Sequence, residues 1–207
     1  MEREPNRALS RRELAADPML QFRRWFDDAD ASGVPLANAM ALATANEEGR
    51  PSVRHVLLRT FGDQGFVFYT NVESRKGREL TENPHGALTI FWKELDRQVC
   101  ASGPVERVSR EESEAYFRTR PREARIGAWA SRQSRVLESR GQLMAQFAEA
   151  DDRFSGDDIP LPPSWGGYRL TPDTVEFWHG RAFRLHDRLR YTRTEGGAAW
   201  RLERLSP

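Results

Sequence analysis

Two apolar runs joined by a tight turn occupy residues 52–71, SVRHVLLRTFGDQGFVFYTN. Each run has the length and the alternating or fully apolar character of a β-strand. The segment between them, Gly62-Asp63-Gln64-Gly65, has the composition of a hairpin turn. The stretch therefore predicts two antiparallel strands, over 52–60 and 65–71.

Runs of the same kind continue on both sides of this pair. They are AMALATA (39–45), GALTIFW (86–92), RQVCASGPVERVS (97–109), YRLTP (168–172), TVEFWHG (174–180) and RLRYTRT (188–194), which forms a closing hairpin with AWRLERL (199–205) around Glu195-Gly196-Gly197. Helices are expected from Asp17-Pro18 to Ser32-Gly33 and over 73–83, 111–120 and 134–154, with a Pro-rich connection at 157–167. Closely spaced strands with tight turns favour a mainly β fold, an antiparallel barrel with peripheral helices.

Length and charge limit the possible classes of protein. The chain has 207 residues, which predicts a single domain over 17–207 preceded by a flexible, Arg-rich arm over 1–16. With 32 basic and 31 acidic residues the net charge is +1, so neither nucleic acid nor a membrane surface is an expected partner. The single Cys100 excludes an internal disulfide, and no apolar run approaches the roughly 18 residues of a membrane helix. We expect a cytoplasmic protein.

Several catalytic signatures are absent from the sequence. There is no GxGxxG after a strand, no GxxxxGK[ST], no HExxH and no GxSxG, and the four His lack metal-ligand spacing. A Rossmann dehydrogenase, a P-loop NTPase, a zinc hydrolase and a serine hydrolase are therefore not expected, nor is a metal site.

Cationic side chains gather near the predicted strand ends instead. Arg54 and Arg59 are five residues apart, so a regular strand would point them to opposite faces. Tyr69-Thr70 ends a strand, and Ser74-Arg75-Lys76 opens a helix, where two cations beside free backbone N–H groups predict a phosphate site. The competing interpretation is a solvated face, but Lys76 is one of only two Lys among the 32 basic residues.

Two later segments add to this set. In RPREARIGAWASRQSR (120–135) the polar pair Gln133-Ser134 follows an apolar stretch. In EFWHGRAFRLHDRLRY (176–191) Arg184, His186 and Arg188 alternate, so an extended segment would place all three on one face.

Long segments of the chain resemble one known family. RHVLLR, FVFYTNVESRKGREL, RQV, YFRTRPREARIGAWASRQS, PPSWGGYRL and VEFWHGRAFRLHDRLRY are similar, in order and spacing, to the pyridoxamine/pyridoxine 5′-phosphate oxidase family, over residues 9–207. The resemblance implies an FMN-binding split β-barrel that works as a homodimer, with each flavin at the subunit interface.

The resemblance also implies roles for fifteen residues. Those matching flavin positions are Arg54, Tyr69, Thr70, Arg75, Lys76, Gln98, Gln133, Ser134, Trp178 and Arg188. Those matching substrate positions are Arg59, Tyr116, Arg120, Arg184 and His186, of which Arg184 and His186 lie over the substrate ring and are the expected catalytic pair. The residue types suit a phosphate, which needs Arg and Lys, and a flavin ring, which needs amide donors and an aromatic neighbour.

Three positions depart from the family pattern. Arg59 stands where the family has Lys, Ala124 stands where it has Ser, and the arm reads Arg3-Glu4-Pro5 without the family's Tyr. Arg for Lys keeps the charge but changes the hydrogen-bond geometry, and Ala for Ser removes a phosphate donor. Phosphate affinity is then weakened, or the substrate is a different one.

Three functions are compatible with these residues. The first is an FMN-dependent oxidase that makes pyridoxal 5′-phosphate from pyridoxamine or pyridoxine 5′-phosphate, with O₂ as acceptor and H₂O₂ as product. The second is a paralogous flavin oxidase of secondary metabolism that acts on dihydrophenazine-type precursors, which the three departures favour. The third is a carrier that binds flavin or pyridoxal phosphate without catalysis, against which the Arg184/His186 pair argues.

Overall fold

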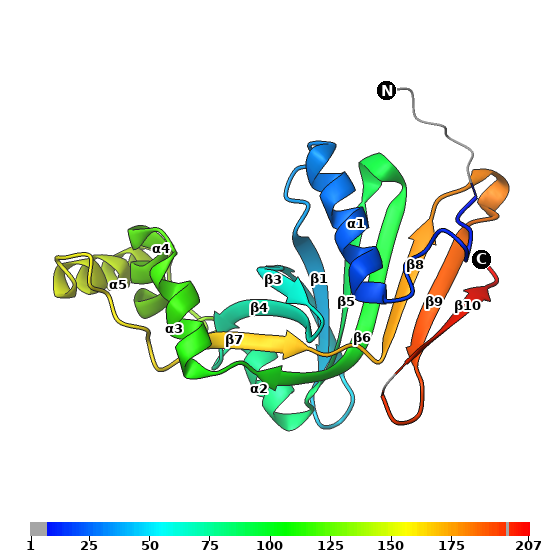
Figure 1. Ribbon diagram of the computed structural model, residues 1–207. Helices are drawn as coiled ribbons and strands as arrows, with labels where there is room; N and C mark the ends of the chain where they lie inside the picture. Colours follow the sequence, from blue (N-terminus) through cyan, green and yellow to red (C-terminus); the bar gives the residue numbers. More distant parts are fainter. Residues whose placement is uncertain (1–7, 198) are drawn as a thin grey trace.

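The computed structural model describes residues 8–197 and 199–207, with the elements labelled in Figure 1. The strands are β1 (Ala39–Ala45), β2 (Pro51–Leu57), β3 (Thr60–Gly62), β4 (Gly65–Asn71), β5 (His85–Trp92), β6 (Arg97–Arg107), β7 (Trp165–Leu170), β8 (Thr174–His179), β9 (Asp187–Arg193) and β10 (Trp200–Leu205). The helices are α1 (Pro18–Ala31), α2 (Arg75–Glu82), α3 (Arg110–Arg118), α4 (Arg122–Ala130) and α5 (Arg140–Arg153), with short 3₁₀ turns η1 (Lys93–Leu95) and η2 (Ala182–Arg184).

Every strand pair is antiparallel, and the main path of hydrogen-bonded neighbours is β10-β9-β8-β6-β5-β1-β2. The hairpin β3-β4 joins this path through β7, which pairs with β4 and with residues 105–107 of β6. Because the long β6 belongs to both parts, the sheet curls into a half-barrel (Figure 1). The prediction of an antiparallel, mainly β fold with peripheral helices is confirmed.

The strand pair predicted over 52–71 is present, with one interruption. β2 ends at Leu57, and the backbone N–H of Leu58 turns away to donate to the Asn38 carbonyl at 2.8 Å before β3 begins. The turn into β4 needs glycine, because Gly65 has φ +118° and a Cβ there would stand 2.0 Å from the Leu170 carbonyl oxygen. Arg59 lies in this interruption between β2 and β3, and the position of its side chain is described below.

Helix α1 packs its apolar face into the half-barrel. Its N-terminus is the predicted one: the Asp17 carboxylate accepts from the backbone N–H of Met19 at 2.6 Å. Phe22 is fully buried with its ring edge-on to Phe66 at 4.9 Å between centroids, and Trp25 packs edge-on to a core phenylalanine of β8 at 5.1 Å. This aromatic contact joins helix and sheet in one core.

Two predictions about the helices between β6 and β7 were wrong. The stretch GAWAS was expected as a connection, but residues 127–130 form the second half of α4. The following helix was expected from Ser134, but α5 begins at Arg140 with Ser139 as its cap. The physical reason is local: Ser134 has φ +71°, a left-handed conformation that no α-helix can continue through.

A second apolar cluster fastens α3, α4 and the Pro-rich connection beside the barrel. Its buried members are Phe117, Ile126, Ile159, Leu161 and Trp165. Trp165 is the first residue of β7, so this cluster holds the helices at one end of the β4-β7 pair. In the part of the chain that the structure describes, no helix combines the length and apolarity required to cross a bilayer.

The predicted arm lies partly outside the described residues. Within its described part, Leu9 N–H donates to the Asp187 carboxylate at 3.0 Å, and the Ala15 carbonyl accepts from the Tyr191 hydroxyl at 2.6 Å. Residues 9–15 therefore lie against β9. The division into a flexible arm over 1–16 and one domain over 17–207 stays a prediction.

Candidate functional site

A cavity of about 820 Å³ opens where β2, β4, α2 and α4 meet. Ten of the fifteen residues singled out in the sequence line it: Arg54, Arg59, Tyr69, Thr70, Arg75, Lys76, Tyr116, Arg120, Gln133 and Ser134. These residues come from segments far apart in the chain, so the fold has gathered the cationic and amide groups into one place. Arg54 and Arg59 both line the cavity, although five residues along a regular strand would point them to opposite faces; β2 ends at Leu57, before Arg59.

Lys76 is the buried cation at the centre of this cavity wall. Its side-chain ammonium donates to Gln133 Oε1 at 2.8 Å, to Thr70 Oγ1 at 3.0 Å and to Ser74 Oγ at 3.2 Å. Burial, together with the nearby Arg54, lowers the pKa of Lys76 to about 8 although Glu79 acts in the opposite direction. The solvated-face interpretation is thus wrong for Lys76, which is 6% exposed.

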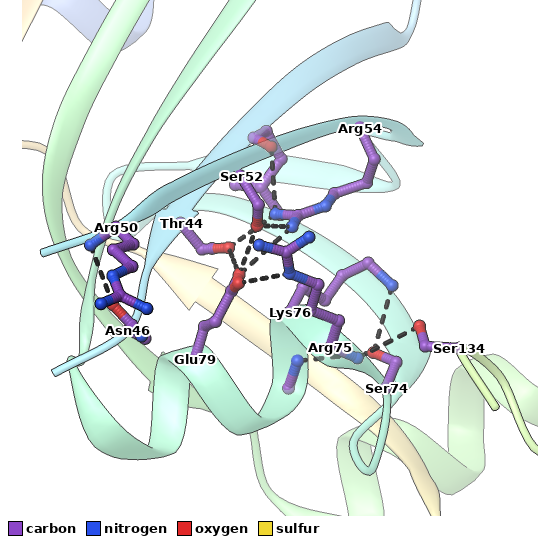
Figure 2. Close-up of polar contacts among 12 residues, drawn as sticks. Thr44, Asn46, Arg50, Ser52, Arg54, Ser74, Arg75, Lys76, Glu79 and Ser134 are labelled. Carbon is purple, nitrogen blue, oxygen red and sulfur yellow. Dashed lines mark hydrogen bonds and ion pairs between the residues drawn. The ribbon is translucent and has the colours of Figure 1, made fainter. Parts of the chain in front are cut away.

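The N-terminus of α2 contributes less to an anion site than expected. The backbone N–H of Arg75 donates to Ser134 Oγ at 3.2 Å, and that of Gly77 donates to its cap, Ser74 Oγ, at 3.4 Å. These amides are engaged, so the expectation of free backbone donors is wrong for them. Side chains carry the positive charge instead: Arg54, Arg75 and Lys76 all line the cavity, and Figure 2 shows the two guanidinium groups together near Glu79 and the Lys76 ammonium toward Ser74.

Arg54 and Arg75 share one carboxylate, that of Glu79, which the sequence did not lead us to expect. Glu79 Oε1 accepts from Arg75 Nε at 2.8 Å, and Glu79 Oε2 accepts from Arg54 Nη2 at 3.2 Å (Figure 2). The i,i+4 spacing of Arg75 and Glu79 on a helix was the available signal. A second signal was the polar Thr44 within the apolar run 39–45, whose hydroxyl donates to Glu79 Oε2 at 2.5 Å.

An aromatic stack forms another wall of the cavity. The rings of Tyr69 and Tyr116 lie nearly parallel at 4.2 Å, and Trp165 continues the stack at 5.4 Å from Tyr69. Burial, followed by the charge of Glu112, raises the pKa of Tyr69 to about 12, so its hydroxyl stays protonated at neutral pH.

Two arginines lie over this stack. The guanidinium carbon of Arg120 is 4.8 Å from the Trp165 ring centroid, and that of Arg59 is 5.7 Å from the Tyr116 ring. Burial lowers the pKa of Arg120, and its Nη1 is buried without a hydrogen-bond partner among the described residues. Arg120 lines the cavity, and a cavity-lining guanidinium group with an unsatisfied nitrogen suits an anionic ligand.

The other five predicted site residues lie elsewhere in the chain, and none of them lines this cavity. Gln98, Trp178 and Arg188 stand directly opposite one another on β6, β8 and β9, which places them on one face of the sheet. Phe91 of β5 is the partner of Gln98 and extends the row, with its ring 6.4 Å from that of Trp178. The residues that alternate with this row are buried in the core, so the row faces outward.

The loop after β8 holds Arg184 and His186, and it is not extended as expected. Phe183 and Arg184 both have left-handed backbone, at φ +58° and +63°, and β9 begins only at Asp187. Strained backbone of this kind is common at binding sites. The Arg181 N–H donates to His186 Nδ1 at 3.0 Å, and the imidazole lies 4.7 Å from the Trp178 ring. A neutral His186 therefore carries its proton on Nε2.

The row on the outer sheet face and this loop form a second group of functional residues. We call it the outer group: Gln98, Trp178, Arg184, His186 and Arg188. Exposed apolar side chains surround it, with Phe183 93%, Leu185 68% and Phe91 54% exposed. Such a patch is typical of a surface that another protein chain covers.

Comparison with known proteins agrees with this geometry. Residues 26–154 match the family model described as pyridoxamine 5′-phosphate oxidase, and residues 165–207 match that of the pyridoxine 5′-phosphate oxidase C-terminal dimerisation region. The chain is 57% identical to the pyridoxine/pyridoxamine 5′-phosphate oxidase of Frankia alni over 94% of this chain and 82% of that one. It is 52% identical to the enzyme of the same name from Burkholderia lata, covering 97% and 94%.

Solved structures show the same fold. PhzG from Burkholderia lata, crystallised with tetrahydrophenazine-1-carboxylic acid, superimposes with a TM-score of 0.89 at 35% identity over 95% of both chains. A pyridoxamine 5′-phosphate oxidase-related, FMN-binding protein from Nostoc punctiforme has a TM-score of 0.74 at 19% identity, covering 94% of this chain and all of that one.

The curled antiparallel sheet with its peripheral helices is the fold of the FMN-binding split barrels. Within that class, the two family models together span nearly all of the described chain. The chain belongs to the pyridoxine/pyridoxamine 5′-phosphate oxidase family, as the resemblance of its motifs implied.

Proposed function

We propose that this protein is an FMN-dependent oxidase that converts pyridoxine and pyridoxamine 5′-phosphates to pyridoxal 5′-phosphate, and that it acts as a homodimer. The observation that carries the proposal is the division of the predicted site. Ten residues with phosphate and ring chemistry line one cavity, and the outer group lies on another face beside exposed apolar side chains. A second copy of the chain would bring its outer group to the cavity of the first.

The residues present fit a flavin mononucleotide. Arg54, Arg75 and Lys76 supply the charge that a phosphate monoester needs, and Gln133 supplies an amide beside them. The partner subunit's Gln98, Trp178 and Arg188 would supply the amide, the aromatic neighbour and the further cation. The chemistry that bound FMN supplies is acceptance of a hydride equivalent from the substrate and delivery of two electrons to O₂, which gives H₂O₂.

The protein's own residues bind and orient the substrate. Arg120 and Arg59, which lie over the aromatic stack and line the cavity, would hold the substrate phosphate. Arg184 and His186 would lie over the substrate ring, with His186 Nε2–H as a hydrogen-bond donor, because Nδ1 accepts from the Arg181 backbone. Orientation and charge complementarity are then the protein's main contributions to rate.

The alternative substrate is a dihydrophenazine-type precursor. Similarity to PhzG and the presence of Ala124 in the cavity wall favour it. Against it stand the higher identity to the curated vitamin B6 oxidases and the two arginines over the stack.

Anaerobic reduction of the flavin distinguishes these functions. The purified protein should be yellow and should release FMN on denaturation. Pyridoxine 5′-phosphate should bleach the flavin absorbance near stoichiometrically, and the dephosphorylated vitamer should do so only at much higher concentration. If neither phosphate ester bleaches a flavin that dithionite does reduce, the vitamin B6 assignment fails, and bleaching by a dihydrophenazine carboxylate would establish the alternative.

A further inference from the structure

Glu79 is a buried carboxylate beside the cavity that does not line it. It is 5% exposed, in the second turn of α2, and it faces β1 and β2. Four side chains donate to it: Ser52 Oγ at 2.6 Å and Thr44 Oγ at 2.5 Å, besides the Arg54 and Arg75 contacts given above (Figure 2). These hydrogen bonds outweigh the effect of burial and lower the pKa of Glu79 to about 2.

The two arginines differ in how strongly the rest of the fold holds them. Arg54 also donates to the Leu42 carbonyl at 3.2 Å and to the Thr44 and Ser52 hydroxyls, and its side chain is 20% exposed. The Arg75 side chain is 60% exposed, and its guanidinium donates to Glu79. Without the carboxylate, Arg75 would be free to move into solvent, and two neighbouring guanidinium groups would repel each other.

The charges around the cavity also match one class of ligand. Arg54, Arg75 and Lys76 are cationic, and Glu79 is the carboxylate among them, which leaves a net of two positive charges. A phosphate monoester carries about two negative charges above its second pKa near 6. A flavin without the phosphate offers these groups only neutral hydroxyl and carbonyl acceptors, and no opposite charge.

We propose that Glu79 is a positioning residue of the phosphate subsite: it does not touch the ligand, but it holds Arg54 and Arg75 together so that both face a phosphate monoester. This inference depends on the proposed binding of FMN in the cavity. It predicts an effect on recognition of the phosphate alone, whereas a merely structural role for Glu79 would affect every flavin equally.

The test compares dissociation constants for FMN and for riboflavin, measured by quenching of flavin fluorescence on the full-length apoprotein. In Glu79→Gln the ratio of riboflavin to FMN dissociation constants should fall about ten-fold, the worth of one charge-assisted contact, with riboflavin affinity nearly unchanged. Glu82→Gln, an exposed carboxylate on the same helix, is the matched control and should behave as wild type. A ratio that stays constant or rises in Glu79→Gln overturns the inference.

Two further measurements keep the test decisive. Thr44→Val removes one donor to Glu79 without changing its charge, and it should lower the same ratio by a smaller factor even if Glu79→Gln does not fold. The negative charge of Glu79 raises the pKa of Lys76, so Glu79→Gln should lower that pKa. The decline of FMN affinity with rising pH should therefore begin at a lower pH in this variant. If the wild-type protein binds no FMN, the proposed function fails, whereas normal FMN binding with an unaltered ratio rejects only the role of Glu79.

Discussion

Affinity for FMN should fall steeply as the pH rises above 8, because Lys76 loses its proton there. Its ammonium is buried, and burial lowers its pKa to about 8 in the free protein. A bound phosphate favours the charged form, so the pKa of Lys76 rises on binding and, above pH 8, binding takes up a proton. Glu79 keeps its charge over this range, and the phosphate is already dianionic.

The size of the effect follows from this linkage. About half of the Lys76 side chains are charged at pH 8 and about one in a hundred at pH 10, so the charged fraction falls roughly fifty-fold over this range, and the dissociation constant for FMN rises with it. The rise ends when binding to the neutral lysine takes over. One charge-assisted contact to a phosphate is worth roughly 10–100-fold in affinity, so the plateau lies about that far above the value at pH 7. Lys76→Met should show this weakened affinity at every pH.

The assay is a titration of apoprotein with FMN from pH 6.5 to 10, followed by flavin fluorescence. Lys93→Met is the matched control, because Lys93 is the other lysine of the chain and is exposed. It should reproduce the wild-type curve, and riboflavin should bind with no comparable pH dependence. A wild-type curve that is flat to pH 10, or a Lys76→Met curve that keeps the wild-type slope, would rule out a role for the Lys76 charge in FMN binding.

Three further predictions test other parts of the structure. Arg120→Gln should raise KM for pyridoxine 5′-phosphate about ten- to a hundred-fold in steady-state assays with kcat little changed, because the phosphate is bound alike in ground and transition states; a fall in kcat alone would contradict this. Phe183→Glu should shift the protein toward the 23.8 kDa monomer in light scattering, since it places a charge in the exposed apolar patch, and an unchanged dimer would argue against that interface. In urea titrations from pH 5 to 2 the apoprotein should lose up to roughly 3 kcal/mol of stability that Glu79→Gln does not lose. The pKa of Glu79 is depressed in the folded protein, so its ionised form stabilises the fold above the ordinary carboxyl pKa, and this contribution vanishes as the pH falls toward 2. Equal losses in the two proteins would contradict the hydrogen bonding of Glu79 to Arg54 and Arg75.

Strand periodicity and turn chemistry were sufficient to predict most of the sheet. The structure contains the predicted strand at 65–71 and the predicted hairpin around Glu195-Gly196-Gly197. Both could be predicted because glycine-dependent turns and apolar alternation are local properties of the sequence. Helix α4 was missed since its residues 127–130 look like a connection. The burial of Ile126 in the second apolar cluster, which also contains Phe117 and Trp165, stabilises this helix.

The site could be predicted by residue type but not by arrangement. The sequence indicated Lys76 as a cation of special interest, yet its burial depends on Thr70 and Gln133, which the fold brings to it from β4 and from the loop after α4. Glu79 gave only a weak signal, because a carboxylate four residues after an arginine is most often a surface pair. No local pattern could have shown that the outer group lies apart from the cavity within one chain.

Each proposed site combines the cavity of one subunit with the outer group of its partner, and a complementation experiment tests this arrangement. Arg59→Ala/Arg120→Ala alters the cavity and Arg184→Ala/His186→Ala alters the outer group. At a substrate concentration near the wild-type KM each homodimer should show little activity, the first because its KM is raised. Co-expressed with different affinity tags and purified as the heterodimer, the pair has one intact site out of two if the sites are shared. The heterodimer should then show about half of the wild-type activity per dimer, measured as H₂O₂ release with pyridoxine 5′-phosphate. A heterodimer no more active than either parent homodimer would contradict the shared site, because every chain would then carry a damaged site of its own.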